Sequence, residues 1–408
     1  MEVVYLIISL PPPGLFIRNL VFASISVISE SGIPSTINYQ GDKVVIEVPR
    51  GLEWELLNHI FIAAKNIAKI KREKGILSPR PNKNDANTFR RFSAETGVQV
   101  DDNDKFVDFA FKVLSWAEKE CRDLPKKFLE SYATLHAKPS KLLLGGDNYA
   151  AIQLFKVEKY EYGKDFLEAP SNVKMQIKHD KYWLALLMAG FALTYAGLAE
   201  NEMVFTTLPE DVIPQVTSKY AHKDFELLYN RLCDIVYSGE KGIAGLVSRI
   251  GRLEPLVAFI QLLSYMFARE WSEQILLSEL TRLPLNLYRV RIGNTFTLIE
   301  RSMGDLAPFA NFAYRLLSRG EGGSRLLQKL ERLCRCALMT RAGLARGCEQ
   351  SYSSYYTLTM KVYQAISGSY NPYNLTYELG RRLTPTQHGV GRIFSEDDLR
   401  VLLDVLTF

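Results

Sequence analysis

The apolar and polar positions of the chain alternate in its first third and follow a helical period through most of the remainder. Residues 2–10 are rich in β-branched and aromatic side chains, which predicts a buried first strand. The same signals predict four further strands, at residues 33–39, 43–48, 141–144 and 151–162. Apolar residues recurring at helical spacing predict three helices, at residues 15–29, 52–74 and 106–121.

Residues 75–105 interrupt this pattern. They are polar, and they contain Pro79 and Pro81, which disfavour continuation of the preceding helix. Several asparagines in the same stretch favour turns. The sequence therefore predicts a loop at residues 75–105, of which residues 80–91 are expected to be poorly ordered in the free protein and to become ordered on duplex DNA.

Beyond about residue 172 helical periodicity dominates, with one predicted hairpin at residues 287–299. The predicted helices are residues 178–200, 222–238, 241–250, 254–280, 306–319, 324–341, 352–367 and 395–406. The sequence thus predicts an α+β fold, in which a mixed sheet-and-helix N-terminal domain precedes a mostly helical C-terminal region. The expected domains are an N-terminal domain at 1–172 with the basic loop 75–105, a helical middle region at 173–280, and a basic helical bundle at 281–408.

Positive charge is concentrated in two segments of the chain. Residues 65–91 contain nine Lys or Arg and two Asp or Glu, and residues 281–350 contain twelve and five. Each segment therefore has a net charge of +7, although the whole chain has a net charge of only +5. Two separate cationic segments predict contact with a polyanion, for which nucleic acid is the best match.

The helix at 52–74 places three cations along one flank of its apolar face. Cations near a helix C-terminus are also stabilised by the helix dipole, so a solvated basic surface is the alternative interpretation. The dipole does not account for the cations of the following loop, where asparagines are candidate readers of base edges. The predicted nucleic-acid-binding residues here are Lys65, Lys69, Arg72, Arg80, Asn82, Lys83, Asn84, Arg90 and Arg91.

The helix at 324–341 places like charges on the face opposite its apolar stripe. A solvated helix usually mixes the two signs at this spacing, and arginine favours bidentate contact with phosphate. The predicted phosphate-binding residues are Arg325, Lys329, Arg332 and Arg335. Ser324 is a candidate N-cap of this helix, and Ser395 with Asp398 resembles a capping box before the last helix.

Signals for catalysis are weak. His179 and Asp180 form a His-Asp dipeptide, with His136 upstream and Asp234 downstream, which is the minimal pattern of a metal-dependent phosphohydrolase. A scaffold whose basic faces bind an acidic protein partner is a further alternative. The sequence favours a protein that is not an enzyme and has no catalytic residue, metal or cofactor.

The composition indicates a folded protein of two or three domains, since the chain has 408 residues of which 47% are hydrophobic. Five cysteines without a CxxC pair predict no disulfide framework and favour the reducing cytoplasm. The apolar N-terminus begins with Glu2 and ends in a run of three prolines, unlike a signal peptide. The apolar run at 182–199 is interrupted by Thr194 and Gly197, so no transmembrane helix is expected.

The order of these features resembles the large subunit of archaeal type I-A CRISPR effector complexes. The resemblance is carried by the segments 11–20 and 186–192 and the basic helix 324–341, within an α+β half, a basic loop and a helical half. It implies a non-catalytic cytoplasmic subunit of a ribonucleoprotein complex in antiviral defence, which contacts the duplex motif flanking the target and the displaced strand. The implied partners are double- and single-stranded DNA, the guide RNA complex, and the backbone, small and helicase-nuclease subunits, with no membrane.

Overall fold

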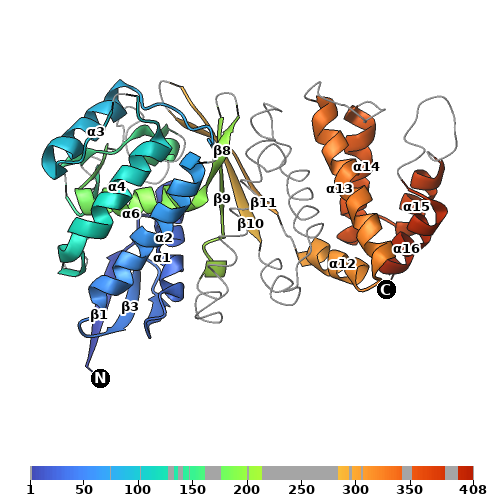
Figure 1. Ribbon diagram of the computed structural model, residues 1–408, viewed down its shortest axis with the longest axis horizontal. Coiled ribbons are helices and arrows are strands. Elements are labelled where there is room, and N and C mark those ends of the chain that lie inside the picture. The colour runs from blue at the N-terminus through green and yellow to red at the C-terminus, as the bar shows by residue number, and fades with distance from the viewer. Residues whose placement is uncertain are drawn as a thin grey trace. The chain divides into compact units, whose positions relative to one another are not determined.

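In the computed structural model of the chain, the first strand and the following hairpin form a three-stranded antiparallel sheet (Figure 1). Its strands are β1 (Val3–Ser9), β2 (Thr36–Tyr39) and β3 (Lys43–Pro49), in the order β1-β3-β2. Gly41 supplies the positive φ of 67° that the tight turn between β2 and β3 requires. The sequence predicts a buried first strand, but β1 lies at the sheet edge, and of its side chains Leu6 and Ile8 are buried whereas Val3 and Tyr5 are exposed.

The structure describes residues 2–73, 75–101, 103–126, 133–136, 141–146, 148–160, 176–199, 202–213, 284–293, 296–304, 307–341, 352–381 and 394–407. The chain forms two compact units, residues 1–233 with 286–301, and residues 234–285 with 302–408. The helices predicted at 222–238, 241–250 and 254–280 lie outside the described residues.

Four helices pack together in the first unit, namely α1 (Phe16–Ser26), α2 (Glu53–Glu73), α4 (Phe106–Glu120) and α6 (Lys181–Thr194). Every residue of α6 from Trp183 to Thr194 is buried. Gly190 lies against the backbone of Leu20, and a side chain at position 190 would collide with the Leu20 carbonyl. Glycine at this position therefore allows α1 and α6 to pack closely.

The predicted loop at 75–105 contains a helix, α3 (Lys83–Thr96), so the prediction is wrong for these residues. Phe89 and Phe92 are both buried, and their burial outweighs the weak helix propensity of the surrounding asparagines. Pro79 and Pro81 precede the helix, where proline removes no helical hydrogen bond. The two prolines therefore mark the start of α3 rather than a loop.

Two further sheets follow. One consists of β4 (Ala133–His136), β5 (Lys141–Leu144), β6 (Tyr149–Ala150) and β7 (Gln176–His179), and the other of β8 (Tyr195–Ala199), β9 (Glu202–Thr207), β10 (Leu285–Arg291) and β11 (Thr297–Gly304). The predicted strands at 287–299 are confirmed as the neighbours β10 and β11.

Two predictions in this part of the chain are wrong. The segment 151–162, predicted as a strand, contains the 3-10 helix η3 (Gln153–Tyr160). The described part of the predicted helical region 173–280 includes three strands, β7, β8 and β9, besides α6. A continuously apolar segment has no clear period, so the pattern does not separate buried strands from a buried helix.

In the second unit, five helices follow the end of β11 among the described residues. They are α12 (Ala307–Leu317), α13 (Glu321–Arg341), α14 (Tyr352–Ile366), α15 (Pro372–Arg381) and α16 (Glu396–Thr407). α15 was not predicted, and α13 begins before Ser324, which lies in its first turn rather than at its N-cap. The capping box of α16 is confirmed, since Ser395 Oγ accepts from the Asp398 N–H at 3.2 Å and Asp398 Oδ2 accepts from the Ser395 N–H at 2.5 Å. The chain thus has the α+β fold that the sequence predicts.

The cysteines differ in state. Cys121 and Cys334 are free and buried, and burial raises the pKa of both thiols. Cys336 is disulfide-bonded, although the sequence predicts no disulfide framework. In the described part of the chain, no helix is both long enough and apolar enough to cross a membrane.

Candidate nucleic-acid interface

The three cations predicted on α2 form ion pairs within the chain. Lys65 pairs with Glu118, and Arg72 Nε donates to Asp108 Oδ1 at 2.8 Å, so both pairs link α2 to α4. Lys69 Nζ lies 3.8 Å from a carboxylate one turn further along α2. The positive charge of this predicted group is therefore balanced by neighbouring carboxylates.

A fourth cation of α2, Lys71, is fully buried. Lys71 Nζ donates to the carbonyl of Ala192 and to the carbonyl of Tyr195 at 2.6 Å, and it lies 5.7 Å from the Tyr195 ring centroid. These carbonyls belong to the C-terminal end of α6, where the helix dipole favours a cation. The helix dipole that this lysine complements is therefore that of α6, a partner that the sequence pattern of α2 does not reveal.

The N-terminal end of α3 is fixed by hydrogen bonds. Asn82 is the N-cap, and its Oδ1 accepts from the Asp85 N–H at 2.9 Å. The Asp85 carboxylate is buried and accepts from the Gln153 N–H at 2.9 Å. Asn82, predicted as a reader of base edges, therefore has a structural role as the cap.

Aromatic packing holds one face of α3 against α4. The Phe89 ring stacks on Phe109 with 3.4 Å between the ring centroids, and Phe92 packs edge-on against Phe109 and Trp116. Phe89 and Phe92 lie one turn apart, so they bury the same side of the helix. The opposite side of α3 is left exposed to solvent.

The exposed side of α3 is strongly cationic. Arg80, Lys83, Asn84, Arg90 and Arg91 are all exposed. Among the described residues, Arg80, Lys83 and Arg91 form no ion pair, and Arg90 Nη1 donates to the neutral Oδ1 of Asn87 at 3.2 Å. Lys83 lies in the first helical turn, where the helix dipole disfavours a cation. Helix stability therefore does not explain this charge.

Asn87 is a residue that sequence reasoning missed. It is exposed between Lys83 and Arg90, at helical spacings of four and three residues from them. Had residues 83–96 been recognised as a helix, this spacing would have placed the three side chains on one face. The nearest exposed acid of α3 is Glu95, whose charge is balanced by Lys181 at 3.1 Å.

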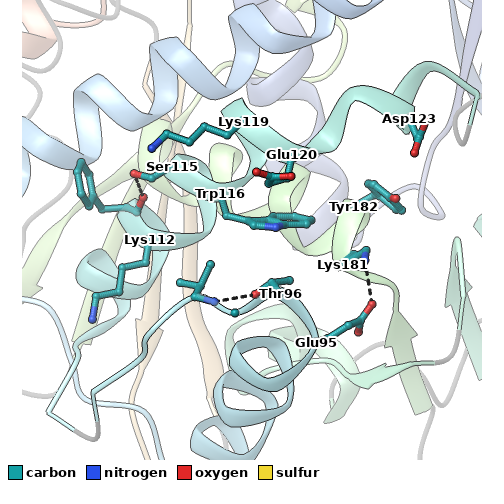
Figure 2. A pocket seen from close by; sticks show the side chains of 13 residues that line it. Glu95, Thr96, Lys112, Ser115, Trp116, Lys119, Glu120, Asp123, Lys181 and Tyr182 are labelled. Carbon is teal, nitrogen blue, oxygen red and sulfur yellow. Dashed lines mark hydrogen bonds and ion pairs between the residues drawn. The ribbon is translucent and has the colours of Figure 1, made fainter.

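A pocket of about 620 Å³ lies where α3 ends, between the last residues of α3, one side of α4 and the first residues of α6 (Figure 2). Trp116 lies at the centre of this view. Lys181 Nζ lies 5.8 Å from the Trp116 ring centroid and 5.7 Å from that of Tyr182. The aromatic faces of the pocket are thus in contact with a cation of the chain itself.

The remaining charges of the pocket are of both signs. Lys112 and Lys119 lie on its α4 side, and Glu120 and Asp123 lie near the end of the same helix. Lys112 is also paired with a carboxylate at 2.6 Å, that of Asp104. The pocket therefore has no excess of positive charge to attract a phosphate, in contrast to the exposed side of α3.

On α13, two of the four predicted residues are exposed. Arg325 and Arg332 lie opposite the buried apolar face that the sequence predicts. Lys329 pairs with Asp398 at the N-terminus of α16. Burial raises the pKa of Asp398, but hydrogen bonds from Lys329 and Ser395 outweigh it and hold this pKa below its ordinary value. The side chain of Arg335 lies outside the described residues.

His179 and Asp180 occupy structural positions. Asp180 is the N-cap of α6, and its Oδ1 accepts from the Trp183 N–H at 2.8 Å. The His179 ring is fully buried, with Nδ1 3.0 Å from the Asp180 carbonyl oxygen, and burial lowers the pKa of His179 to about 4. No group of three or more metal-ligating side chains occurs among the described residues, which exclude Asp234 and the side chain of His136.

Among the described residues, the predicted cations of α2 are ion-paired within the chain, and the cations on or beside α3 form the largest exposed group. Comparison with family models, with curated proteins and with solved structures finds no match to this chain.

Proposed function

We propose that this protein is a non-catalytic DNA-binding subunit, and that the exposed side of α3 contacts duplex DNA. The observation that carries the proposal is the density of cations there. Arg80, Lys83, Arg90 and Arg91 are exposed on or beside one short helix whose exposed acid, Glu95, is paired elsewhere. Such a surface is suited to a row of phosphates.

The side chains between the cations suggest how the duplex is read. Asn84 and Asn87 are exposed on the same side of α3. An α-helix fits the major groove of B-form DNA, and an asparagine amide can pair with the edge of adenine. The cations would position the helix through phosphates, and the two asparagines would supply the sequence preference.

The setting of this activity follows from the resemblance to the large subunit of type I-A CRISPR effector complexes. In such a complex, the duplex bound by α3 would be the motif that flanks the target, while guide RNA reads the target itself. The protein would then act in the cytoplasm, beside the displaced strand and the other subunits of the complex.

The test is equilibrium binding of a duplex panel to the Arg90→Gln, Arg91→Gln double variant across a range of salt concentrations. We expect weaker binding to every duplex, with the slope of log K against log[salt] reduced by about 0.9 for each cation removed. The ranking of the duplexes should not change, because phosphate contacts do not specify sequence.

A matched control is the Arg122→Gln, Lys126→Gln double variant, which removes two exposed cations of the same unit outside α3. It should bind DNA with the affinity and salt slope of the wild type. Equal losses in the two double variants would show that net charge alone governs binding, and the assignment of α3 would then be wrong.

A further inference from the structure

We infer that the free edge of β1 pairs with β1 of a second copy of this chain. In the part of the chain that the structure describes, β1 is the outermost strand of its sheet and pairs with β3 on one side only. This inference is independent of the DNA contact proposed for α3, because the two surfaces lie on different elements of the first unit.

The register of the sheet fixes which backbone groups face the free edge. At one end of the β1–β3 pair the Arg50 N–H donates to the Glu2 carbonyl at 2.9 Å, and at the other end the Leu10 N–H donates to the β2–β3 turn at 2.7 Å. Bonded residues alternate along an antiparallel pair, so the β1 residues bonded to β3 are Val4, Leu6 and Ile8. The residues whose N–H and C=O groups point to the free edge are Val3, Tyr5, Ile7 and Ser9.

β1 lacks the features that usually protect an edge strand. Such strands are commonly short, or contain lysine, proline or a bulge. β1 has seven residues, VVYLIIS, with no charge, no proline and an unbroken register with β3. The opposite edge strand, β2, has only four residues.

The side chains next to this edge are also exposed and apolar. Tyr5 is 54% exposed and Val3 is 39% exposed, and both lie on the outer face of the sheet. Exposed apolar side chains grouped beside unpaired backbone mark an interaction surface rather than an ordinary solvated strand. The partner must therefore supply an extended strand with apolar side chains.

β1 is complementary to itself in the antiparallel orientation. A two-fold axis at Leu6 places Tyr5 opposite Ile7 of the second copy, and Val3 opposite Ser9. Both members of each pair have backbone groups that point to the edge, so each pair exchanges two hydrogen bonds. Tyr5 against Ile7 is a favourable aromatic–β-branched combination. No charged residue of β1 meets another across the seam.

The test is sedimentation velocity of the full chain over a range of concentrations. We expect a concentration-dependent dimer, which the Tyr5→Lys, Ile7→Lys variant weakens by about tenfold or more, because like charges then face each other across the seam. Mixing this variant with the Tyr5→Glu, Ile7→Glu variant should restore the dimer, since each lysine then faces a glutamate. The restored pairing would also establish the register.

The matched control is the Thr36→Lys, Asn38→Lys variant, which adds two lysines to the same face of the sheet on β2. It should dimerise as the wild type does. Amide exchange at Tyr5 and Ile7 should slow as the dimer forms, while Leu6 is protected at every concentration. A wild type that remains monomeric, or a dimer that the β1 lysines leave unchanged, would overturn the inference.

Discussion

Acidification acts on two buried residues of the first unit, His179 and Asp85, with opposite effects on the free energy of unfolding. Burial lowers the pKa of His179 to about 4, although its contact with the Asp180 carbonyl favours the protonated form. Burial raises the pKa of Asp85 to about 6, although the Gln153 N–H favours the carboxylate. Between these values the unfolded chain binds a proton at His179 that the folded protein does not, and the folded protein binds a proton at Asp85 that the unfolded chain does not.

The two effects can be separated by substitution. Asp85→Asn removes the Asp85 effect and leaves that of His179, so acidification from pH 6.5 to pH 4 should lower its free energy of unfolding relative to wild type by on the order of 2 kcal/mol. In His179→Gln only the Asp85 effect remains, so acidification over the same range should instead raise this free energy relative to wild type. Urea unfolding followed by tryptophan fluorescence measures both. Identical pH dependence in the three proteins would show that neither group has a shifted pKa.

At the scale of the element, α3 depends on one residue to begin. Asn82 caps the helix, and replacing an N-cap by alanine costs about 1 kcal/mol. We expect Asn82→Ala to speed amide exchange in the first turn of α3, and Asn82→Ser to preserve the turn, because serine also caps. Neither change should alter the ranking of a duplex panel. If Asn82→Ser changes that ranking while exchange stays slow, Asn82 contacts bases.

Asn84 provides the contrasting prediction for the same helix. Its side chain is exposed and is not the cap, so Asn84→Ala should leave the unfolding free energy close to that of wild type. If Asn84 reads a base, the variant should lose about 1–3 kcal/mol of discrimination at one position of the duplex. Binding to the same panel measures this loss. Unchanged energy gaps between the duplexes would limit α3 to phosphate contact.

The sequence predicts most of the individual helices but not the features that position the candidate site. α2, α4 and α13 have clear apolar faces, and their predicted bounds are close to the observed ones. α3 was missed because its apolar face consists of little more than Phe89 and Phe92, among residues that favour turns. The ion pairs of Lys65 and Arg72 join residues 53 and 36 positions apart, so no local pattern reveals them.

For the whole molecule, folding reduces the charge available to a partner. The segments 65–91 and 281–350 each have a net charge of +7, but in the first segment Lys65 and Arg72 are paired with carboxylates. In the second, Arg289 pairs with Glu202 at 2.6 Å and Lys329 pairs with Asp398. The net charge of a segment therefore overestimates its binding capacity, and the exposed cations of α3 and α13 are the relevant ones.

These exposed cations lead to a prediction for the salt dependence of the full chain. Contact through α3 alone would neutralise about four phosphates. The slope of log K against log[salt] on duplex DNA would then be about −3.6. If Arg325 and Arg332 contact the same duplex as well, the slope should be about −5.4. We expect the steeper value, because Arg325 and Arg332 are exposed on α13. The Arg325→Gln, Arg332→Gln variant should then reduce the slope by about 1.8 without changing the melting temperature, since both side chains lie opposite the buried face of α13. If the wild-type slope is about −3.6 and this variant leaves it unchanged, the interface is confined to α3.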